Sequence, residues 1–208
     1  REYVEAFCNL LLEKELNIEW ACGGAHLKLL NAEIIKLMEK AGCKAIGVGI
    51  ESGKDDILMH MHKGITTAQI KVQLDMIKKN SNIKVMGQFI LGYPLDTIDT
   101  IRQTIDFACD IKIDMASFYT FVPMPGSEIF KHLKERGELA NFEWEKLQMD
   151  KSFYSPPGVP LDQLMKLFKF AYLKFYLRPK IILSILNELT DPSQLRVYWR
   201  RAKVKFFR

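Results

Sequence analysis

The residues of this sequence that are best suited to chemistry follow an apolar segment. Glu51 and Ser52 come directly after residues 44–50, a run of small and apolar side chains with one lysine at its start. A carboxylate beside a hydroxyl at the carboxyl end of a buried strand is well placed to hold a ribose or an amino group. The alternative is that Ser52 only caps the next segment and that Glu51 is solvated.

Two glycines bracket the next apolar segment. Gly87 and Gly92 stand near the two ends of residues 85–91. Because glycine lacks a Cβ, it lets a flat ligand approach the backbone closely. An equally good interpretation is that Gly87 and Gly92 are needed only for packing or for a turn and not for a ligand.

The four cysteines do not form a metal-binding motif. They are separated by 14, 21 and 66 positions, at Cys8, Cys22, Cys43 and Cys109. CxxC zinc spacing and close-set thiolate triplets are absent, so we interpret them as buried, reduced thiols. His26 has no partner at ligand spacing and is interpreted as a surface or hydrogen-bonding histidine. We assign no metal ligand and no catalytic acid or base.

Composition narrows the class of protein. The chain has 208 residues, of which 48% are hydrophobic and 26% charged, with 12 Gly and 8 Pro. These values exclude collagen-like, disordered and disulfide-stapled chains. Residues 1–5 lack the pattern of a signal peptide, and no apolar run reaches the ~18 residues of a membrane-spanning helix. We expect a cytoplasmic protein and, because the chain starts with Arg in a helical pattern, a piece of a longer one.

Strand-like and helix-like segments alternate along residues 1–137. A helix is expected over residues 2–16, strands over 18–22, 44–50, 85–91 and 115–122, and further helices starting at Asn31, Thr66, Asp96 and Ser127. This alternation indicates parallel βαβ units and an α/β fold. Ligands of such sheets lie outside the carboxyl ends of the strands, so the turns after the four strands should line one site. Four units would form either a small open sheet or part of a barrel.

The rest of the chain is expected to be irregular over residues 138–160 and helical over 161–208. From Lys174 to Arg208 there are nine Lys or Arg and two acids, a net of +7, which leaves 5 − 7 = −2 for the first 173 residues. The simplest interpretation of this basic tail is a solvated helix face. Alternatively, the tail binds an anionic membrane surface or a nucleic-acid backbone. Of these two we favour the membrane, because the aromatic residues are clustered and no nucleic-acid motif is present.

Three motifs occur in order along the chain. They are AGCKAIGVGIESG at 41–53, FILGYPLDT at 89–97 and PMPGS at 123–127. Together they resemble the radical S-adenosylmethionine (SAM) superfamily, in particular the branch of iron–sulfur oxidoreductases and methyltransferases that often carries an upstream cobalamin-binding domain. The resemblance runs over nearly the whole chain. It implies a partial TIM-like (βα) barrel, here about four βα units that supply its third to sixth strands, followed by C-terminal helices.

The resemblance also implies which residues bind SAM. Glu51 and Ser52 match the site for the ribose and methionine portions, and Lys63 falls where a basic residue reaches the methionine carboxylate. Gln88 matches a position that hydrogen-bonds the ribose. The positions that match adenine contacts are Ile90, Gly92, Val122, Pro123 and Met124.

The sequence departs from the family pattern at several positions. The CxxxCxxC triplet that binds a [4Fe–4S] cluster and a Gly-Gly-Glu-like turn are absent from this chain, and we expect them before Arg1. Without a cluster SAM is not cleaved reductively, so this chain alone is predicted to be inactive. His26 and Lys28 stand where relatives often carry Arg and an acid, which alters substrate contacts. Asp96 replaces a Glu and keeps a helix-capping acid.

The sequence thus predicts part of a radical SAM enzyme that orients SAM for chemistry on a small organic substrate. The resemblance implies an electron donor such as flavodoxin or ferredoxin, and it leaves open whether cobalamin is used. One alternative is a catalytically silent binding or scaffold domain that retains the barrel without a cluster. A cluster-free barrel lyase is a weaker alternative, because His, Asp and Lys are not clustered. We also expect the first edge of the sheet to be exposed, because the strands that would pair there are absent.

Overall fold

The computed structural model describes residues 2–140 and 154–188, in which parallel strands alternate with helices. The strands are β1 (Trp20–Ala25), β2 (Cys43–Glu51), β3 (Lys84–Leu91) and β4 (Met115–Thr120). The helices are α1 (Glu2–Glu13), the 3-10 helix η1 (Leu27–Leu29), α2 (Ala32–Lys40), α3 (Asp55–His60), α4 (Thr67–Asn80), α5 (Ile98–Asp110), α6 (Glu128–Glu135), α7 (Leu161–Tyr176) and α8 (Pro179–Glu188).

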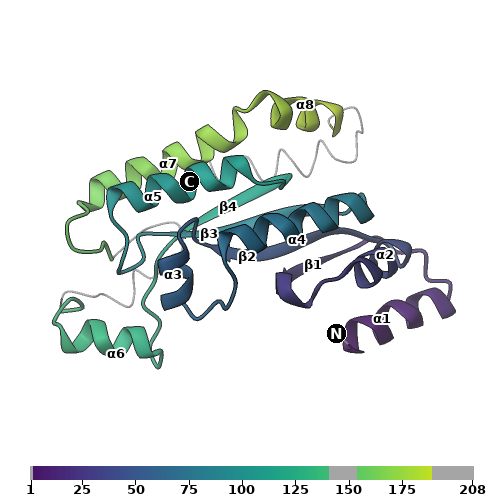
Figure 1. The fold of residues 1–208 in the computed structure, drawn as a ribbon, viewed down its shortest axis with the longest axis horizontal. Helices are drawn as coiled ribbons and strands as arrows, with labels where there is room; N and C mark the ends of the chain where they lie inside the picture. The colour runs from purple at the N-terminus through teal and green to yellow at the C-terminus, as the bar shows by residue number, and fades with distance from the viewer. Residues whose placement is uncertain (1, 141–153, 189–208) are drawn as a thin grey trace.

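The four strands form one parallel sheet in the order β1-β2-β3-β4 (Figure 1). Each pair of neighbouring strands is joined by at least one helix, as parallel pairing requires. The predicted α/β class with about four βα units and C-terminal helices is confirmed. Of the helical region expected over residues 161–208, residues 189–208 lie outside the described residues, and the division of the chain at residues 137 and 160 stays a prediction.

Local sequence signals set the starts of the helices. The Asn31 side chain accepts a hydrogen bond from the backbone N–H of Ile34, and Thr66 and Gln69 form a reciprocal capping box. Both starts were expected from the sequence. Gly42 then ends the turn after α2 with a φ of +92°, a conformation in which glycine carries no steric penalty.

The structure corrects the sequence-based prediction at three places. Thr97, not Asp96, caps α5. Gly23 and Gly24 lie inside β1, which starts at Trp20 and not at Ile18. Helix α3 was not expected, because its six residues are too few to show a helical period.

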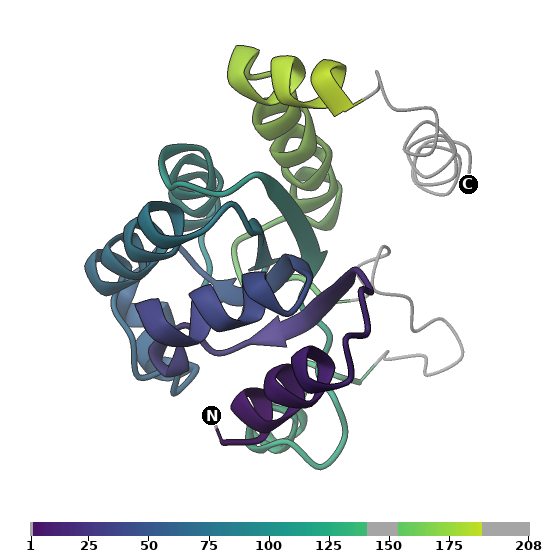
Figure 2. The same cartoon turned by 90° about the vertical axis from the view of Figure 1, so that its right-hand side faces the viewer.

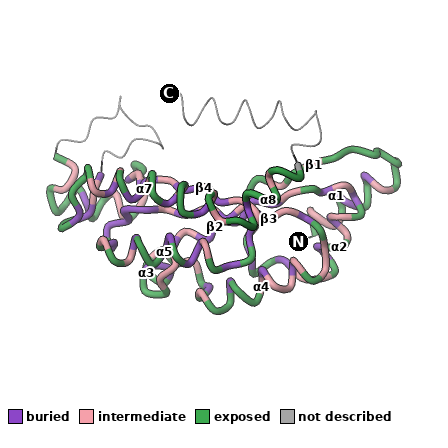
Figure 3. Tube along the Cα trace, turned by 90° about the horizontal axis from the view of Figure 1, so that it is seen from above, coloured by how far each residue is buried: buried purple, intermediate pink, exposed green. Residues whose placement is uncertain are grey.

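The two faces of the sheet differ. Along β3, Val85, Gly87, Phe89 and Leu91 are buried, whereas the residues between them are half-exposed. Helices α2, α4 and α5 lie over the buried face, which carries the main hydrophobic core (Figures 1 and 2). We call this the covered face and the opposite one, with Gly49, Gln88 and Ser117, the open face. Buried and exposed stretches alternate around each helix (Figure 3), as expected for amphipathic helices on a core.

The two edges of the sheet also differ. At the β4 edge, the Tyr172 hydroxyl accepts from Phe118 N at 3.1 Å and donates to Phe118 O at 3.0 Å. The Tyr176 hydroxyl contacts Ala116 N at 3.3 Å and Ala116 O at 2.9 Å in the same way. These bonds satisfy backbone groups that an edge strand leaves unpaired. Among the described residues β1 pairs with β2 alone, and its exposed edge agrees with the prediction.

Within residues 2–140 and 154–188, the structure contains no helix with the length and apolar character needed to cross a bilayer.

Candidate functional site

The candidate site begins where β2 ends, in a tight turn centred on Glu51. Glu51 has a φ of +70°, and Ser52 N donates to Ile50 O at 3.0 Å, which closes a three-residue γ-turn. The pairing of β2 with β3 shifts register between Gly49 and Glu51. Bulges of this kind redirect side chains, and backbone strain of this kind clusters at functional sites.

The turn brings the Glu51 carboxylate to Lys63. Lys63 Nζ lies 3.1 Å from Glu51 Oε1, and the side chains of Lys63 and Glu51 are 23% and 21% exposed. A Cβ built on Gly49 would lie 2.5 Å from Glu51 Oε1, so glycine leaves the space that the carboxylate occupies. Glu51 is therefore not the freely solvated carboxylate of the alternative interpretation. The pair offers acceptors for hydroxyl or ammonium groups and donors for a carboxylate.

Gln88 and Ile90 lie on the same side of the sheet as this pair. Gln88 pairs in register with Gly49 on one side and with Ser117 on the other, and all three belong to the open face. Ile90 packs against a second hydrophobic cluster. The structure thus brings four of the predicted site residues to one end of the open face: Glu51, Lys63, Gln88 and Ile90.

That second cluster lies beyond the carboxyl ends of the strands. Its buried members are Ile57, Tyr93, Phe121, Leu133 and Tyr154. These residues come from α3, the turn after β3, the end of β4, α6 and the segment before α7. Because Ile90 packs against them, the cluster forms an apolar wall beside Ile90.

Ser52 is not brought together with these residues. It is 2% exposed, and its Oγ accepts from Lys54 N at 3.1 Å and lies 3.3 Å from Thr104 Oγ1 on α5. The bond from Lys54 N closes an ST-turn before α3, whose N-cap is Lys54 and has no side-chain cap hydrogen bond, so Ser52 does not cap the helix as the alternative supposed. A role for its hydroxyl in binding SAM stays a prediction.

The glycines near the ends of β3 serve packing in this structure. A Cβ on Gly87 would lie 2.9 Å from Ile113 Cδ1, within the core of the covered face. A Cβ on Gly92, whose φ is +80°, would lie 2.7 Å from Leu164 Cδ2 on α7. For Gly87 the geometry favours the packing interpretation over ligand approach.

The remaining predicted adenine contacts lie beyond the end of β4. Val122 is half-exposed, Pro123 is buried and Met124 is 58% exposed. Their contact with adenine, like that of Gly92, stays a prediction.

Sequence reasoning missed the structural role of Asp96 and the importance of Thr104. Asp96 is 5% exposed, and its Oδ2 accepts from Gly92 N at 3.0 Å and Tyr93 N at 2.9 Å. Burial raises the pKa of Asp96, and hydrogen bonds from Thr100, Tyr93 and Gly92 oppose that rise. The signal for Thr104 was weak, since it is only a polar residue on the apolar side of α5.

Lys28 also has a place near the site. Its Nζ donates to Gly64 O at 2.6 Å and so ties the segment after β1 to the residue that follows Lys63. His26 is exposed at the start of η1.

The cysteines do not provide a site for an iron–sulfur cluster. All four are free thiols within the described residues, with Cys8 and Cys43 buried. Burial raises the pKa of Cys43 to about 11 and also raises that of Cys8, which disfavours the thiolate that binds iron. Within the described ranges, no three His, Cys, Asp or Glu side chains are grouped to hold a metal ion.

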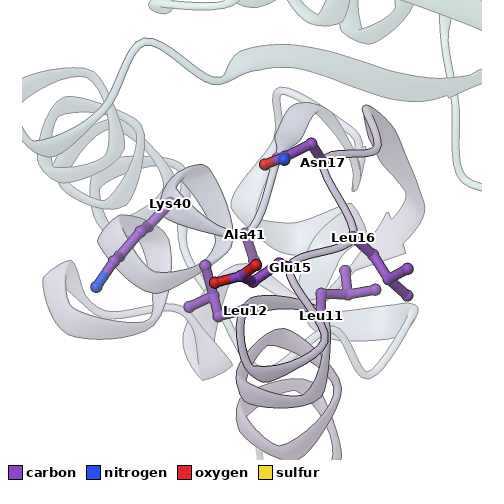
Figure 4. A pocket seen from close by; sticks show the side chains of 8 residues that line it. Leu11, Leu12, Glu15, Leu16, Asn17, Lys40 and Ala41 are labelled. Carbon is purple, nitrogen blue, oxygen red and sulfur yellow. The ribbon is translucent and has the colours of Figure 1, made fainter.

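A cavity of about 320 Å³ lies at the opposite end of the sheet (Figure 4). Its lining is Leu11, Leu12, Glu15, Leu16, Asn17, Lys40, Ala41 and Gly42. These residues precede the amino ends of β1 and β2, so this cavity is not part of the candidate site.

The charged pair lies at the carboxyl ends of parallel strands, the place where proteins built from (βα) units bind their ligands. A family model described as the radical SAM superfamily matches residues 1–108, which is more than half of the chain. The chain belongs to the radical SAM superfamily.

Its relatives in sequence include methyltransferases and a cyclase. An uncharacterised methyltransferase of Pyrococcus horikoshii is 30% identical over 178 residues, 85% of this chain and 38% of that protein. The anaerobic magnesium-protoporphyrin IX monomethyl ester cyclase of Rubrivivax gelatinosus is 26% identical over 85% of this chain and 31% of its own length. The bacteriochlorophyllide d C-12(1)-methyltransferase of Chlorobaculum tepidum is 26% identical over 74% of this chain and 33% of its own length. The chain thus spans about a third of the length of these relatives.

Solved structures of the family share the fold. Coproporphyrinogen III oxidase (HemN) from Escherichia coli, a radical SAM enzyme, matches with a TM-score of 0.56 and 12% identity over 83% of this chain and 36% of that one. The methyltransferase TsrM from Kitasatospora setae, with cobalamin and a [4Fe–4S] cluster bound, matches with a TM-score of 0.53 and 14% identity over 79% of this chain and 34% of that one. The four strands therefore have the fold of a radical SAM TIM-like barrel.

Proposed function

We propose that this chain is the part of a radical SAM enzyme that orients SAM for chemistry on a small organic substrate. The observation that carries the proposal is the Glu51–Lys63 pair, 3.1 Å apart and only about a fifth exposed, on the open face of a radical SAM fold. A partly buried pair of opposite charges suits a ligand that carries both an ammonium and a carboxylate, as the methionine portion of SAM does.

Each residue of the site has a distinct task in this proposal. Lys63 donates to the methionine carboxylate, and Glu51 accepts from the methionine ammonium or from a ribose hydroxyl. Gln88, beside Gly49 on the next strand, hydrogen-bonds the ribose, and Ile90 offers an apolar contact to adenine. When bound, SAM supplies the radical chemistry, and the side chains of this chain hold it in place.

The residues of this chain do not fit a [4Fe–4S] cluster, because the four thiols are dispersed and two are buried. In this proposal the CxxxCxxC ligands lie outside the 208 residues, and the chain by itself is inactive. A flavodoxin or ferredoxin would donate the electron.

The proposed reaction is methyl transfer or oxidative chemistry. Its support is that the relatives are named as methyltransferases and as a cyclase. TsrM is a methyltransferase whose structure holds cobalamin, so cobalamin is a candidate second cofactor here. We propose a cytoplasmic location for the enzyme.

The proposal is tested by SAM affinity in the protein expressed from its complete reading frame and purified without oxygen. Lys63→Met removes the carboxylate donor and is expected to raise the Kd for SAM about tenfold or more, the range for loss of a charged hydrogen bond. Lys131→Met is the matched control, because Lys131 forms an exposed ion pair with Glu135 at 3.9 Å and lies on α6.

A wild-type protein that binds no SAM, or equal effects of both substitutions, would overturn the proposal. Binding of SAM without formation of 5′-deoxyadenosine under reducing conditions would support the alternative, a catalytically silent binding domain.

The basic tail, residues 174–208, carries a separate proposal that rests on the sequence, because its residues 189–208 lie outside the described residues. We propose that it contacts an anionic membrane surface through its lysines, arginines and aromatic residues. Co-sedimentation with phosphatidylglycerol vesicles, but not with phosphatidylcholine vesicles, is expected for the full chain and not for a chain that ends at residue 188. Equal sedimentation of the two chains would overturn the membrane proposal and favour the simpler interpretation, in which the tail is a solvated helix face.

A further inference from the structure

The backbone that follows Glu51 is anchored to Thr104 on α5. Thr104 Oγ1 accepts from Gly53 N at 3.0 Å and lies 3.3 Å from Ser52 Oγ. Thr104 and Ser52 are 1% and 2% exposed, so water does not compete for these bonds. The first two residues after the turn are thus held on the covered face, on the other side of the sheet from the ligand site.

Packing holds the same two residues. A Cβ on Gly53 would lie 2.7 Å from Phe107 Cβ and 2.9 Å from Thr104 Cα, so the Gly53 backbone lies directly against α5. Ser52 Oγ accepts from Lys54 N at 3.1 Å, which continues the link into α3. The segment after Glu51 therefore has little freedom to move.

Glu51 depends on such support. A φ of +70° is unfavourable for a residue with a Cβ and persists only where the surrounding structure holds it. Its carboxylate has one described partner, Lys63, while its backbone position is fixed by the γ-turn to Ser52. If the anchor on α5 loosens, Glu51 can relax to negative φ, and its side chain then leaves the space above Gly49.

We infer that Thr104 is a positioning residue for SAM binding, whose hydroxyl anchors Gly53 and Ser52 and thereby directs the Glu51 carboxylate toward Lys63. Thr104 itself does not touch the ligand. The inference rests on the proposed function, because it assigns Thr104 to the same site.

The test compares three substitutions on α5 in the protein expressed from its complete reading frame. Thr104→Val keeps the shape of the side chain but removes the acceptor of Gly53 N, and it is expected to raise the Kd for SAM about tenfold. Thr104→Ser keeps the hydroxyl and is expected to remain within about threefold of wild type. Ile105→Val removes a methylene group from the core of the same helix, and no change in SAM affinity is expected.

A double-mutant cycle separates positioning from general destabilisation. In a Glu51→Gln background, Thr104→Val is expected to change the Kd by less than about twofold, because the two changes disable one function. A merely structural role would weaken SAM binding by the same factor in both backgrounds and overturn the inference. Amide hydrogen exchange gives a readout without ligand, since exchange at Gly53 is expected to rise in Thr104→Val and not in Ile105→Val.

The outcomes distinguish this inference from the proposed function. If wild type binds no SAM, the proposed function fails and this inference fails with it. A second outcome is that wild type binds SAM and Lys63→Met weakens this binding, while Thr104→Val has no more effect than Ile105→Val. In that case only this inference fails. If Thr104→Val does not fold, Thr104→Cys replaces it. Its Kd for SAM is expected to exceed that of Thr104→Ser, because a thiol is a weaker hydrogen-bond partner than a hydroxyl, and equal Kd values for the two variants would overturn the inference.

Discussion

The two faces of the sheet use the same strands for different purposes. On β3, the residues that point to the covered face are Val85, Gly87, Phe89 and Leu91, all buried. The residues between them, among them Gln88 and Ile90, point to the open face and are half-exposed. Because side chains alternate along a strand, one segment of eight residues supports the core and also lines the site.

Substitutions on the two faces are expected to act differently. Changes on the covered face are expected to remove packing and lower the free energy of unfolding, whereas changes on the open face are expected to weaken the proposed SAM contacts and leave the core intact. Glu51 and Ser52 are neighbours in sequence but belong to opposite faces, and both lie in the turn over residues 50–52.

The largest effect is expected on the covered face, from Phe118→Ala. The Phe118 ring is 1% exposed and stacks on Phe89 with centroids 5.4 Å apart. Removing a buried phenyl ring leaves a cavity and is expected to lower the free energy of unfolding by about 3–5 kcal/mol. Urea denaturation measures this loss, and a loss below about 1 kcal/mol would mean that the core does not lie on this face.

Asp96→Ala is expected to lower the free energy of unfolding by less than Phe118→Ala does. The change leaves the N–H groups of Gly92 and Tyr93 without their acceptor. A buried group without a partner costs about 1–3 kcal/mol. Asp96→Asn keeps one acceptor oxygen and is the matched control, with a smaller loss expected in the same denaturation experiment.

The same carboxyl group predicts a dependence on pH. Burial raises the pKa of Asp96 in the folded chain, so between its unfolded and folded pKa the folded state binds more protons than the unfolded state. Stability from this group therefore falls as the pH rises through that interval. Wild type is expected to gain stability relative to Asp96→Asn as the pH is lowered from 7 toward about 4, the ordinary pKa of an aspartate. A difference that is constant with pH would contradict this.

Tyr172→Phe, at the β4 edge, is expected to lower the free energy of unfolding modestly. The lost hydroxyl serves both Phe118 N and Phe118 O, and a net hydrogen bond contributes about 0.5–1.5 kcal/mol. Tyr3→Phe, at a site that is 83% exposed, is the control and is expected to change stability by less than about 0.5 kcal/mol. Equal thermal unfolding of the two variants would show that Tyr172 does not protect this edge.

The smallest effect on stability is expected on the open face, from Gln88→Ala. Gln88 is half-exposed, so the free energy of unfolding is expected to change by less than about 0.5 kcal/mol. The Kd for SAM is nevertheless expected to rise about tenfold, the value of a lost ligand hydrogen bond. Isothermal titration checks the affinity, and an unchanged Kd would remove Gln88 from the site.

The sequence was sufficient to predict the parallel α/β fold, because buried strands and amphipathic helices alternate with clear caps such as Asn31 and Thr66. The direction of Ser52 also follows from the sequence, because a period of two places Glu51 on the face of Gly49 and Ser52 on the other face, as the structure has them. The prediction that both residues bind SAM came from the family resemblance and did not use this period. Pairing of Lys63 with Glu51 depends on α3, whose six residues gave no periodic signal.

The two tyrosines on α7 take the place of a neighbouring strand at the edge of β4. Tyr172 and Tyr176 are four residues apart on a helix, a rise of about 6 Å, while Ala116 and Phe118 are two residues apart on a strand, a rise of about 6.6 Å. Because these lengths nearly match, two hydroxyl groups on a helix serve the backbone groups that a fifth strand would otherwise bind. The sheet is thus terminated at β4 by side chains, and among its described edges only β1 offers a backbone to which a further strand can add.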